Sequence, residues 1–246
     1  MTQDQIILST FVMEAIFWLG AYVLIIRHAF RERIHAMPVV AMCGNISWEF
    51  ILGLGLYPAC PVYWASCPQQ IMGPVTLFAA LLDAFILYTI LRFGREQFRR
   101  FDLVYRYFPV MVALGVIAAL GIIYFFMTEL YTTNIYAAQV GGQTPAFLQA
   151  GLQGGIFTGW GLALMMGLLF IAMLTSRNDL RAQSLYIALF MMLGNLGAFL
   201  FDITAAPRMP GLVNVLVLLS LSVNALYVVL VYRKAQALGI NPWRRW

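Results

Sequence analysis

Long apolar stretches alternate with short polar segments along the whole chain. Each stretch has about 20 residues, the length of a helix that crosses the hydrocarbon core of a bilayer. We expect seven such helices, at about residues 5–26, 38–56, 72–92, 107–127, 150–174, 182–202 and 210–232. No polar segment between them is long enough for a soluble domain. The pattern therefore predicts an all-α, polytopic membrane protein, a seven-transmembrane helix bundle that forms a single domain over residues 1–246.

Composition and charge agree with a multi-pass integral membrane protein. Hydrophobic residues make up 62% of the chain and charged residues 10%, which argues against an ordinary soluble enzyme. All of the 15 lysines and arginines except Arg208 follow odd-numbered stretches. By the positive-inside rule, the N-terminus is expected outside and the C-terminus in the cytoplasm. The net charge of +5 thus indicates contact with lipid headgroups and no nucleic-acid partner.

Four carboxyl groups lie inside the apolar stretches: Glu14, Glu49, Asp83 and Asp202. A charged side chain at membrane depth costs at least about 2.5 kcal/mol, so an acid in this position indicates a functional site by default. No basic residue is expected at the same depth. We therefore expect at least the deeper groups to be protonated at neutral pH, in which state they can donate protons.

The neighbours of two acids suggest a shared cavity. Asn45 lies one helical turn before Glu49 and can bind either the carboxyl group or a common ligand. Asn195, Phe199 and Asp202 are spaced i, i+4 and i+7 and are expected to share a helix face. Glu49 and Asp202 both lie toward the outer side, where one cavity can hold both. A structural hydrogen bond between helices is the alternative for Glu49. For Asp202, which is expected at a helix end, the alternative is a carboxyl group that is simply solvated.

Cysteines and histidines do not predict a metal site. Cys43 is expected to be a small buried residue, while Cys60 and Cys67 flank an outer loop that either closes as a disulfide or stays reduced. His28 and His35 are expected in the first cytoplasmic loop, and their spacing matches no metal-ligand pattern. We therefore expect neither a metal nor a cofactor. The outer segment 128–149 is either a lid over a site or a simple connection.

One segment resembles a known family. The residues from Asn45 to Phe50 (Asn-Ile-Ser-Trp-Glu-Phe), followed by Tyr57-Pro58, resemble the second span of integral membrane terpene cyclases. These cyclases act in fungal meroterpenoid and indole-diterpene biosynthesis, and bacterial relatives act on farnesylated indole alkaloids. The family consists of small seven-helix bundles with two essential acids, a Glu in the second span and an Asp in the sixth. The resemblance implies that Glu49 and Asp202 have these catalytic roles here.

The resemblance also implies a reaction. It is the metal-independent, proton-initiated cyclisation of a farnesyl or geranylgeranyl chain, epoxidised or not, on an aromatic, indole or peptide-type head. The partners would be a prenylated small molecule and the lipid bilayer, with no protein partner evident. The membrane would be the inner or plasma membrane in a bacterium and the endoplasmic reticulum in a fungus. We favour Asp202 as proton donor, because it lies nearer the expected cavity mouth, and Glu49 as stabiliser or base.

Other sequence features agree with this chemistry. The chain lacks the Asp-Asp-x-x-Asp cluster that holds magnesium on a diphosphate and the Asp-x-Asp-Asp motif of soluble protonating cyclases. Aromatic faces stabilise cations, although core packing is an alternative for each ring. Beyond the two acids, the candidate substrate-contacting residues are Asn45, Trp48, Trp18, Phe199, Asn195, Glu14, Asp83 and Trp160.

Two other membrane functions fit the sequence less well. A proton-coupled small-solute transporter also uses buried acids, but the chain shows no internal repeat of the kind found in such carriers. A retinal protein needs a lysine within its seventh span, whereas the only lysine, Lys234, lies at the cytoplasmic end. Trp64, Trp243 and Trp246 are expected to be interfacial anchors.

Overall fold

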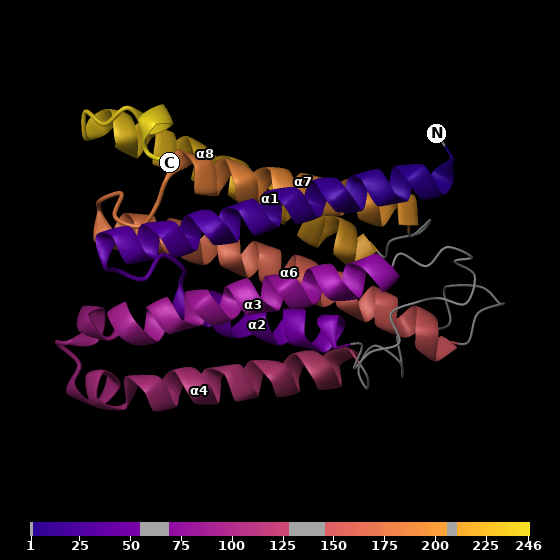
Figure 1. Ribbon diagram of the computed structural model, residues 1–246, viewed down its shortest axis with the longest axis horizontal. Coiled ribbons are helices and arrows are strands. Elements are labelled where there is room, and N and C mark those ends of the chain that lie inside the picture. The colour runs from indigo at the N-terminus through magenta and orange to yellow at the C-terminus, as the bar shows by residue number, and fades with distance from the viewer. Residues whose placement is uncertain (1, 55–68, 128–145, 206–210) are drawn as a thin grey trace.

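A computed structural model describes residues 2–54, 69–127, 146–205 and 211–246 (Figure 1). This part of the chain forms seven α-helices, which confirms the predicted all-α bundle. Six of them are long and apolar enough to cross a membrane, and the remaining one, the second, is shorter. The helices are α1 (Gln3–Glu32), α2 (Val39–Gly53), α3 (Gln69–Phe93), α4 (Asp102–Phe125), α6 (Ala146–Arg177), α7 (Leu185–Ala205) and α8 (Gly211–Ala237), with 3₁₀ turns η1 (Arg95–Phe98) and η3 (Pro242–Arg244).

Several helix boundaries differ from the expected ones. Helix α1 continues to Glu32 and ends at Arg33, which has φ 50°, so His28 lies within the helix and not in a loop. Helix α2 has only 15 residues, about 22 Å at 1.5 Å per residue. Helix α4 begins at Asp102 and kinks at Tyr107, just before Pro109, because proline lacks the amide hydrogen that a straight helix needs.

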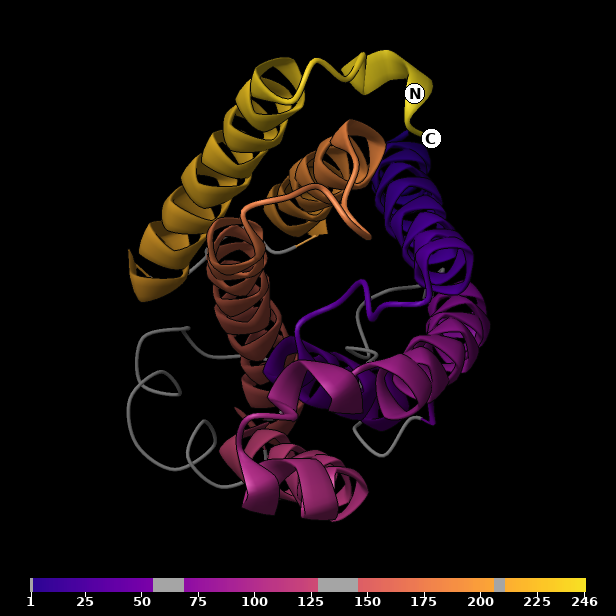
Figure 2. The same cartoon turned by 90° about the vertical axis from the view of Figure 1, so that its left-hand side faces the viewer.

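The helices run antiparallel to their chain neighbours and form a ring (Figures 1 and 2). Around this ring α1 packs on α3, α3 on α2, and α2 on α6. Helix α8 packs against both α6 and α7, and α7 returns to α1, which it contacts more extensively than any other helix pair in the bundle. Helix α4 lies outside the ring against α2. Segments far apart in the sequence therefore surround one interior.

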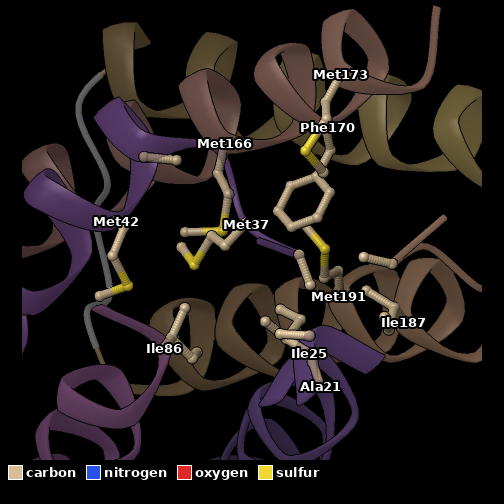
Figure 3. Close-up of a cluster of buried hydrophobic side chains, with 14 of the residues drawn as sticks. Ala21, Ile25, Met37, Met42, Ile86, Met166, Phe170, Met173, Ile187 and Met191 are labelled. Atoms are coloured by element: carbon tan, nitrogen blue, oxygen red, sulfur yellow. The ribbon is translucent and has the colours of Figure 1, made fainter. Parts of the chain in front are cut away.

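The interior of one half of the bundle is filled by apolar side chains (Figure 3). They come from the end of α1, the start of α2, the end of α3, the end of α6 and the start of α7. The fully buried members include Met37, Met42, Ile86, Phe170 and Met191. Dense packing of this kind resists changes in side-chain volume. It closes the ring at this end and leaves the opposite half for the acids.

Basic residues gather at the closed end, as the sequence pattern predicted, and two of them have structural roles. We call this the basic end: residues 28–38, 94–101, 177–184 and 238–246. The guanidinium of Arg245 binds both carboxylate oxygens of Glu32 at 2.7 and 2.9 Å and donates to two backbone carbonyls. Arg177 donates to the carbonyl oxygen of His35 at 2.9 Å and lies 3.1 Å from its Nε2. These bonds tie the connections between helices together. Which side of the membrane the basic end faces stays a prediction.

His35 is therefore held as a neutral acceptor. It is buried between α1 and α2, and burial, followed by the charge of Arg177, lowers the pKa of its imidazole to about 3. Protonation would place a second positive charge against the Arg177 guanidinium.

Some predictions fall outside the described residues. They are the Cys60–Cys67 disulfide, the anchor role of Trp64 and most of the lid or connection at 128–149, whose residues 146–149 belong to helix α6. Cys43 is buried with a free thiol, as expected. Trp243 and Trp246 are exposed, and the Trp246 ring lies 4.1 Å from the guanidinium of Arg27.

Candidate functional site

A cavity of about 190 Å³ occupies the half of the bundle away from the basic end. Five helices contribute to its wall: α1, α2, α3, α6 and α7. Three of the four predicted acids, Glu14, Glu49 and Asp202, line it. Two asparagines, six aromatic residues and aliphatic side chains complete most of the remaining wall. Its larger lining residues include Phe11, Glu14, Trp18, Tyr22, Asn45, Trp48, Glu49, Trp160, Asn195, Phe201 and Asp202.

Asp202 is held by an indole group. Nε1 of Trp160 in α6 donates to Oδ2 of Asp202 in α7 at 2.7 Å, and both side chains are buried. The bond is short, and it becomes stronger when its acceptor is ionised. Trp160 in turn packs against Val213 and Val217 of α8, so the donor has a fixed position.

Glu49 is held by a phenol. Oη of Tyr22 in α1 donates to Oε1 of Glu49 in α2 at 3.3 Å. The sequence suggested that Asn45 binds either the Glu49 carboxyl group or a common ligand. The structure shows no direct hydrogen bond between Asn45 and Glu49. Its amide nitrogen lies 2.7 Å from Oη of Tyr22 and 2.7 Å from Oδ2 of Asp83 in α3. Asn45 thus reaches the Glu49 carboxyl group through Tyr22.

Glu14 completes the acidic set. Its side chain is half-buried, lines the cavity and forms no hydrogen bond among the described residues. Gly197 of α7 lies directly beside it, since a Cβ atom there would come within 2.6 Å of the Glu14 backbone nitrogen. This close approach of α1 and α7 brings Glu14 near enough to Asp202 for their charges to interact.

The four carboxyl groups lie close to one another in this half of the bundle. Glu14 lies near Asp202 and Glu49, and Glu49 lies near Asp83. Within the described residues, the ion pairs are all at the basic end and involve Glu32 or Asp179. The cavity therefore presents its carboxyl groups as hydrogen-bond partners and proton donors and not as members of ion pairs.

Aromatic rings form much of the cavity wall. The rings of Trp18 and Tyr22 lie 5.8 Å apart between centroids, as do those of Phe11 and Phe201. Trp48 points its Nε1 away from the acids, to the carbonyl oxygen of Gly155 at 3.3 Å and to a threonine hydroxyl. Ring faces of this kind suit a cavity in which positive charge appears transiently.

Eight of the ten predicted site residues line the cavity, and Phe199 and Asp83 do not. Phe199 packs against the cluster of Trp160, Val213 and Val217, because position i+4 from Asn195 turns toward α8 while positions i+3 and i+6 face the cavity. Asp83 is fully buried behind the wall, where it accepts the hydrogen bond from Asn45.

Sequence reasoning missed Phe11, Tyr22 and Phe201. Tyr22 lies four residues after Trp18 and eight after Glu14, so it continues the same helix face. That spacing was a usable signal, but a tyrosine among apolar residues also fits core packing. In the described part of the chain, no three His, Cys, Asp or Glu side chains are grouped closely enough to hold a metal ion.

Comparison with known proteins gives a consistent set of similarities. A model of the family described as Pyr4-like transmembrane terpene cyclases matches residues 2–233. The Pyr4-family terpene cyclase mfmH of Annulohypoxylon moriforme is 29% identical over 168 residues, which cover 68% of this chain and 57% of that protein. The terpene cyclase macJ of Penicillium terrestre is 24% identical over 186 residues, 76% of this chain and 62% of that protein.

The similarity to a third relative is shorter. The terpene cyclase andB of Emericella variicolor is 26% identical over 106 residues, 42% of this chain and 40% of that protein. The chain thus spans less than two thirds of the length of each of these relatives. No solved structure matches the chain.

Proposed function

Because this chain belongs to the family of Pyr4-like transmembrane terpene cyclases, we propose that it closes rings in a prenyl chain by protonating it within the membrane. One observation carries the proposal: Asp202 and Glu49 line the same largely apolar cavity, and a hydrogen-bond donor holds each of them. Neither is paired with a basic residue in the part of the chain that the structure describes. Family membership also favours a cyclase over the proton-coupled transporter that buried acids alone left open.

We assign the first step to Asp202. Its carboxyl group gives a proton to the terminal alkene carbon or epoxide oxygen of the substrate, which leaves a carbocation on the chain and a carboxylate on Asp202. The indole N–H of Trp160 stabilises that carboxylate, because a hydrogen bond to a charged acceptor is stronger than one to a neutral acceptor. Solvent returns the proton to Asp202 between turnovers.

The remaining steps use the rest of the cavity wall. As successive double bonds attack the cation, rings form and positive charge moves along the chain past the faces of Trp18, Trp48 and Tyr22. Glu49 removes a proton from carbon at the end and then releases it. The product is an isomer of the substrate, and no metal or cofactor is needed for any step.

The proposed substrate is a farnesyl or geranylgeranyl chain on an aromatic, indole or peptide-type head. The aromatic wall and the small number of polar groups suit a hydrocarbon chain more than a polar solute. We propose that the prenyl chain enters the cavity and that the head stays near its opening. The proposal includes both the epoxide and the alkene forms of the chain.

A substrate panel tests the proposal. Purified protein in detergent is incubated with farnesyl- and geranylgeranyl-arenes, each as epoxide and alkene, and products are recognised by chromatographic shift and loss of alkene signals. Asp202→Asn and Glu49→Gln keep the size of each side chain and are expected to lower turnover about 10²- to 10⁴-fold, the contribution of a general acid or base. Glu96→Gln, at an exposed carboxyl group of the basic end, is the matched control and is expected to retain turnover. Equal turnover by the wild type and the two cavity variants would contradict the assignment.

A further inference from the structure

The hydrogen bonds around Glu49 have a defined direction. Asn45 presents one amide nitrogen, at 2.7 Å from both the Tyr22 hydroxyl and the Asp83 carboxyl group. This nitrogen carries two hydrogens and accepts none, so it donates to both neighbours. Oη of Tyr22 is then an acceptor toward Asn45, and its single hydrogen points to Oε1 of Glu49. The direction runs from Asn45 to Tyr22 and from Tyr22 to Glu49.

Asp83 fixes this direction. It is fully buried in α3, outside the cavity lining, and it accepts from the Asn45 amide. In this arrangement the amide nitrogen of Asn45, and not its carbonyl oxygen, faces Oδ2 of Asp83. A single chain of polar groups thus joins α3, α2 and α1 and ends on one oxygen of Glu49.

The two oxygens of Glu49 are not equivalent as a result. Oε1 accepts from Tyr22. Oε2 has no hydrogen bond among the described residues and is not among their fully buried unpartnered atoms, so it is the oxygen that Glu49 presents to the cavity. An oxygen that accepts a hydrogen bond is a poor place for a proton. The proton of Glu49, when present, therefore sits on Oε2.

We propose that Tyr22, Asn45 and Asp83 are positioning residues that reserve Oε1 of Glu49 as an acceptor and direct Oε2 at the substrate. Like the assignment of Glu49 as the base, this rests on the proposed function. It explains why Asp83, which the sequence suggested as a substrate contact, lies behind the cavity wall. It also gives a role to Tyr22, which cannot be told from an ordinary core residue in the sequence.

Infrared spectroscopy tests the positioning without a substrate. The absorption of the Glu49 carboxyl group is obtained from the difference between wild-type and Glu49→Gln protein in detergent. Tyr22→Phe removes the donor to Oε1 and is expected to shift this band. If Glu49 is protonated, the band should move to higher frequency, because its C=O group loses a hydrogen bond. Tyr227→Phe is the matched control, because that buried hydroxyl donates to Gln183 near the basic end. A Glu49 band unchanged by Tyr22→Phe, or shifted equally by both variants, would overturn the proposal.

Kinetics distinguishes positioning from direct chemistry at Asp83. An asparagine there still offers an acceptor to the Asn45 amide, whereas a leucine does not. With a substrate that the wild type converts, we expect Asp83→Leu and Tyr22→Phe to lower kcat about 10- to 100-fold, the cost of a misaligned base, with little change in KM. Asp83→Asn is expected to be at least about five-fold more active than Asp83→Leu.

The two variants at Asp83 decide the matter. Equal loss of kcat in Asp83→Asn and Asp83→Leu, with both proteins folded by circular dichroism and size-exclusion chromatography, would mean that Asp83 acts through its own proton. If the wild type converts no substrate of the panel, the proposed function fails, while the infrared result still decides whether Tyr22 orients Glu49.

Discussion

Replacing Trp160 by Phe removes one hydrogen-bond donor from the cavity and keeps an aromatic ring in its place. Nε1 of Trp160 lies 2.7 Å from Oδ2 of Asp202, and both side chains are buried. A hydrogen bond between neutral groups contributes about 1 kcal/mol and one to a charged group about 1.5–3 kcal/mol. The bond therefore strengthens by roughly 0.5–2 kcal/mol as Asp202 loses its proton in the first step.

This difference sets the expected rate. Since 1.4 kcal/mol corresponds to a factor of ten, kcat of Trp160→Phe should fall about 2- to 30-fold, with little change in KM. The assay is the initial rate of cyclisation over a range of concentrations of a substrate that the wild type converts. Only an interaction that is stronger in the transition state than in the ground state produces this pattern.

Trp48→Phe is the matched control for this experiment. It removes the same atoms from the same cavity, but Nε1 of Trp48 donates to the Gly155 carbonyl oxygen and to a threonine hydroxyl, which gain no charge in the reaction. We expect a smaller fall in kcat for this variant. An unchanged kcat in Trp160→Phe, or an equal fall in both variants, would refute the assignment of Asp202 as the donor.

Three further changes test how the fold supports the site. Gly197→Ala forces a Cβ atom to within 2.6 Å of the Glu14 backbone, so it should cost about 1–3 kcal/mol of stability and lower turnover. In the control Gly161→Ala, the new Cβ atom has no atom within 4 Å, and neither stability nor turnover should fall. Thermal unfolding and turnover assays check both variants. Arg245→Ala removes the guanidinium nitrogen that contacts both oxygens of the partly buried Glu32 carboxylate and should cost about 1–3 kcal/mol; an unchanged Tm would contradict this. The folded-state pKa of His35, about 3, lies below the value of 6.5 expected when unfolded, so stability is full above pH 6.5 and falls toward pH 3. At pH 5 the loss is about 2 kcal/mol, and His35→Gln should weaken the pH dependence of Tm.

The sequence was sufficient to predict the architecture, because the apolar stretches have the length of the helices. It also placed Glu49 and Asp202 in one cavity, since both lie toward the C-terminal ends of two helices that run in the same direction. It could not resolve which neighbour each side chain meets. Phe199 shares a helix face with Asp202 in sequence, yet packs toward α8, because helix rotation is set by packing against neighbours.

The hydrogen bonds between helices were beyond sequence reasoning for the same reason. Nothing in the spacing of Tyr22, Asn45 and Asp83 indicates that three helices bring them together, since each position alone fits core packing or a substrate contact. The donors to Glu49 and Asp202, namely Tyr22 and Trp160, come from helices other than those of the two acids. Helix periodicity describes one helix at a time.

Cyclisation in heavy water tests the central claim most directly, namely that cavity carboxyl groups start and end the reaction. The account predicts one carbon-bound deuterium in a product formed from an alkene substrate and none in a product formed from an epoxide, where the proton goes to oxygen. It also predicts that both products are strongly reduced in Asp202→Asn and Glu49→Gln. An alkene-derived product without carbon-bound deuterium, or undiminished product from Asp202→Asn, would contradict it.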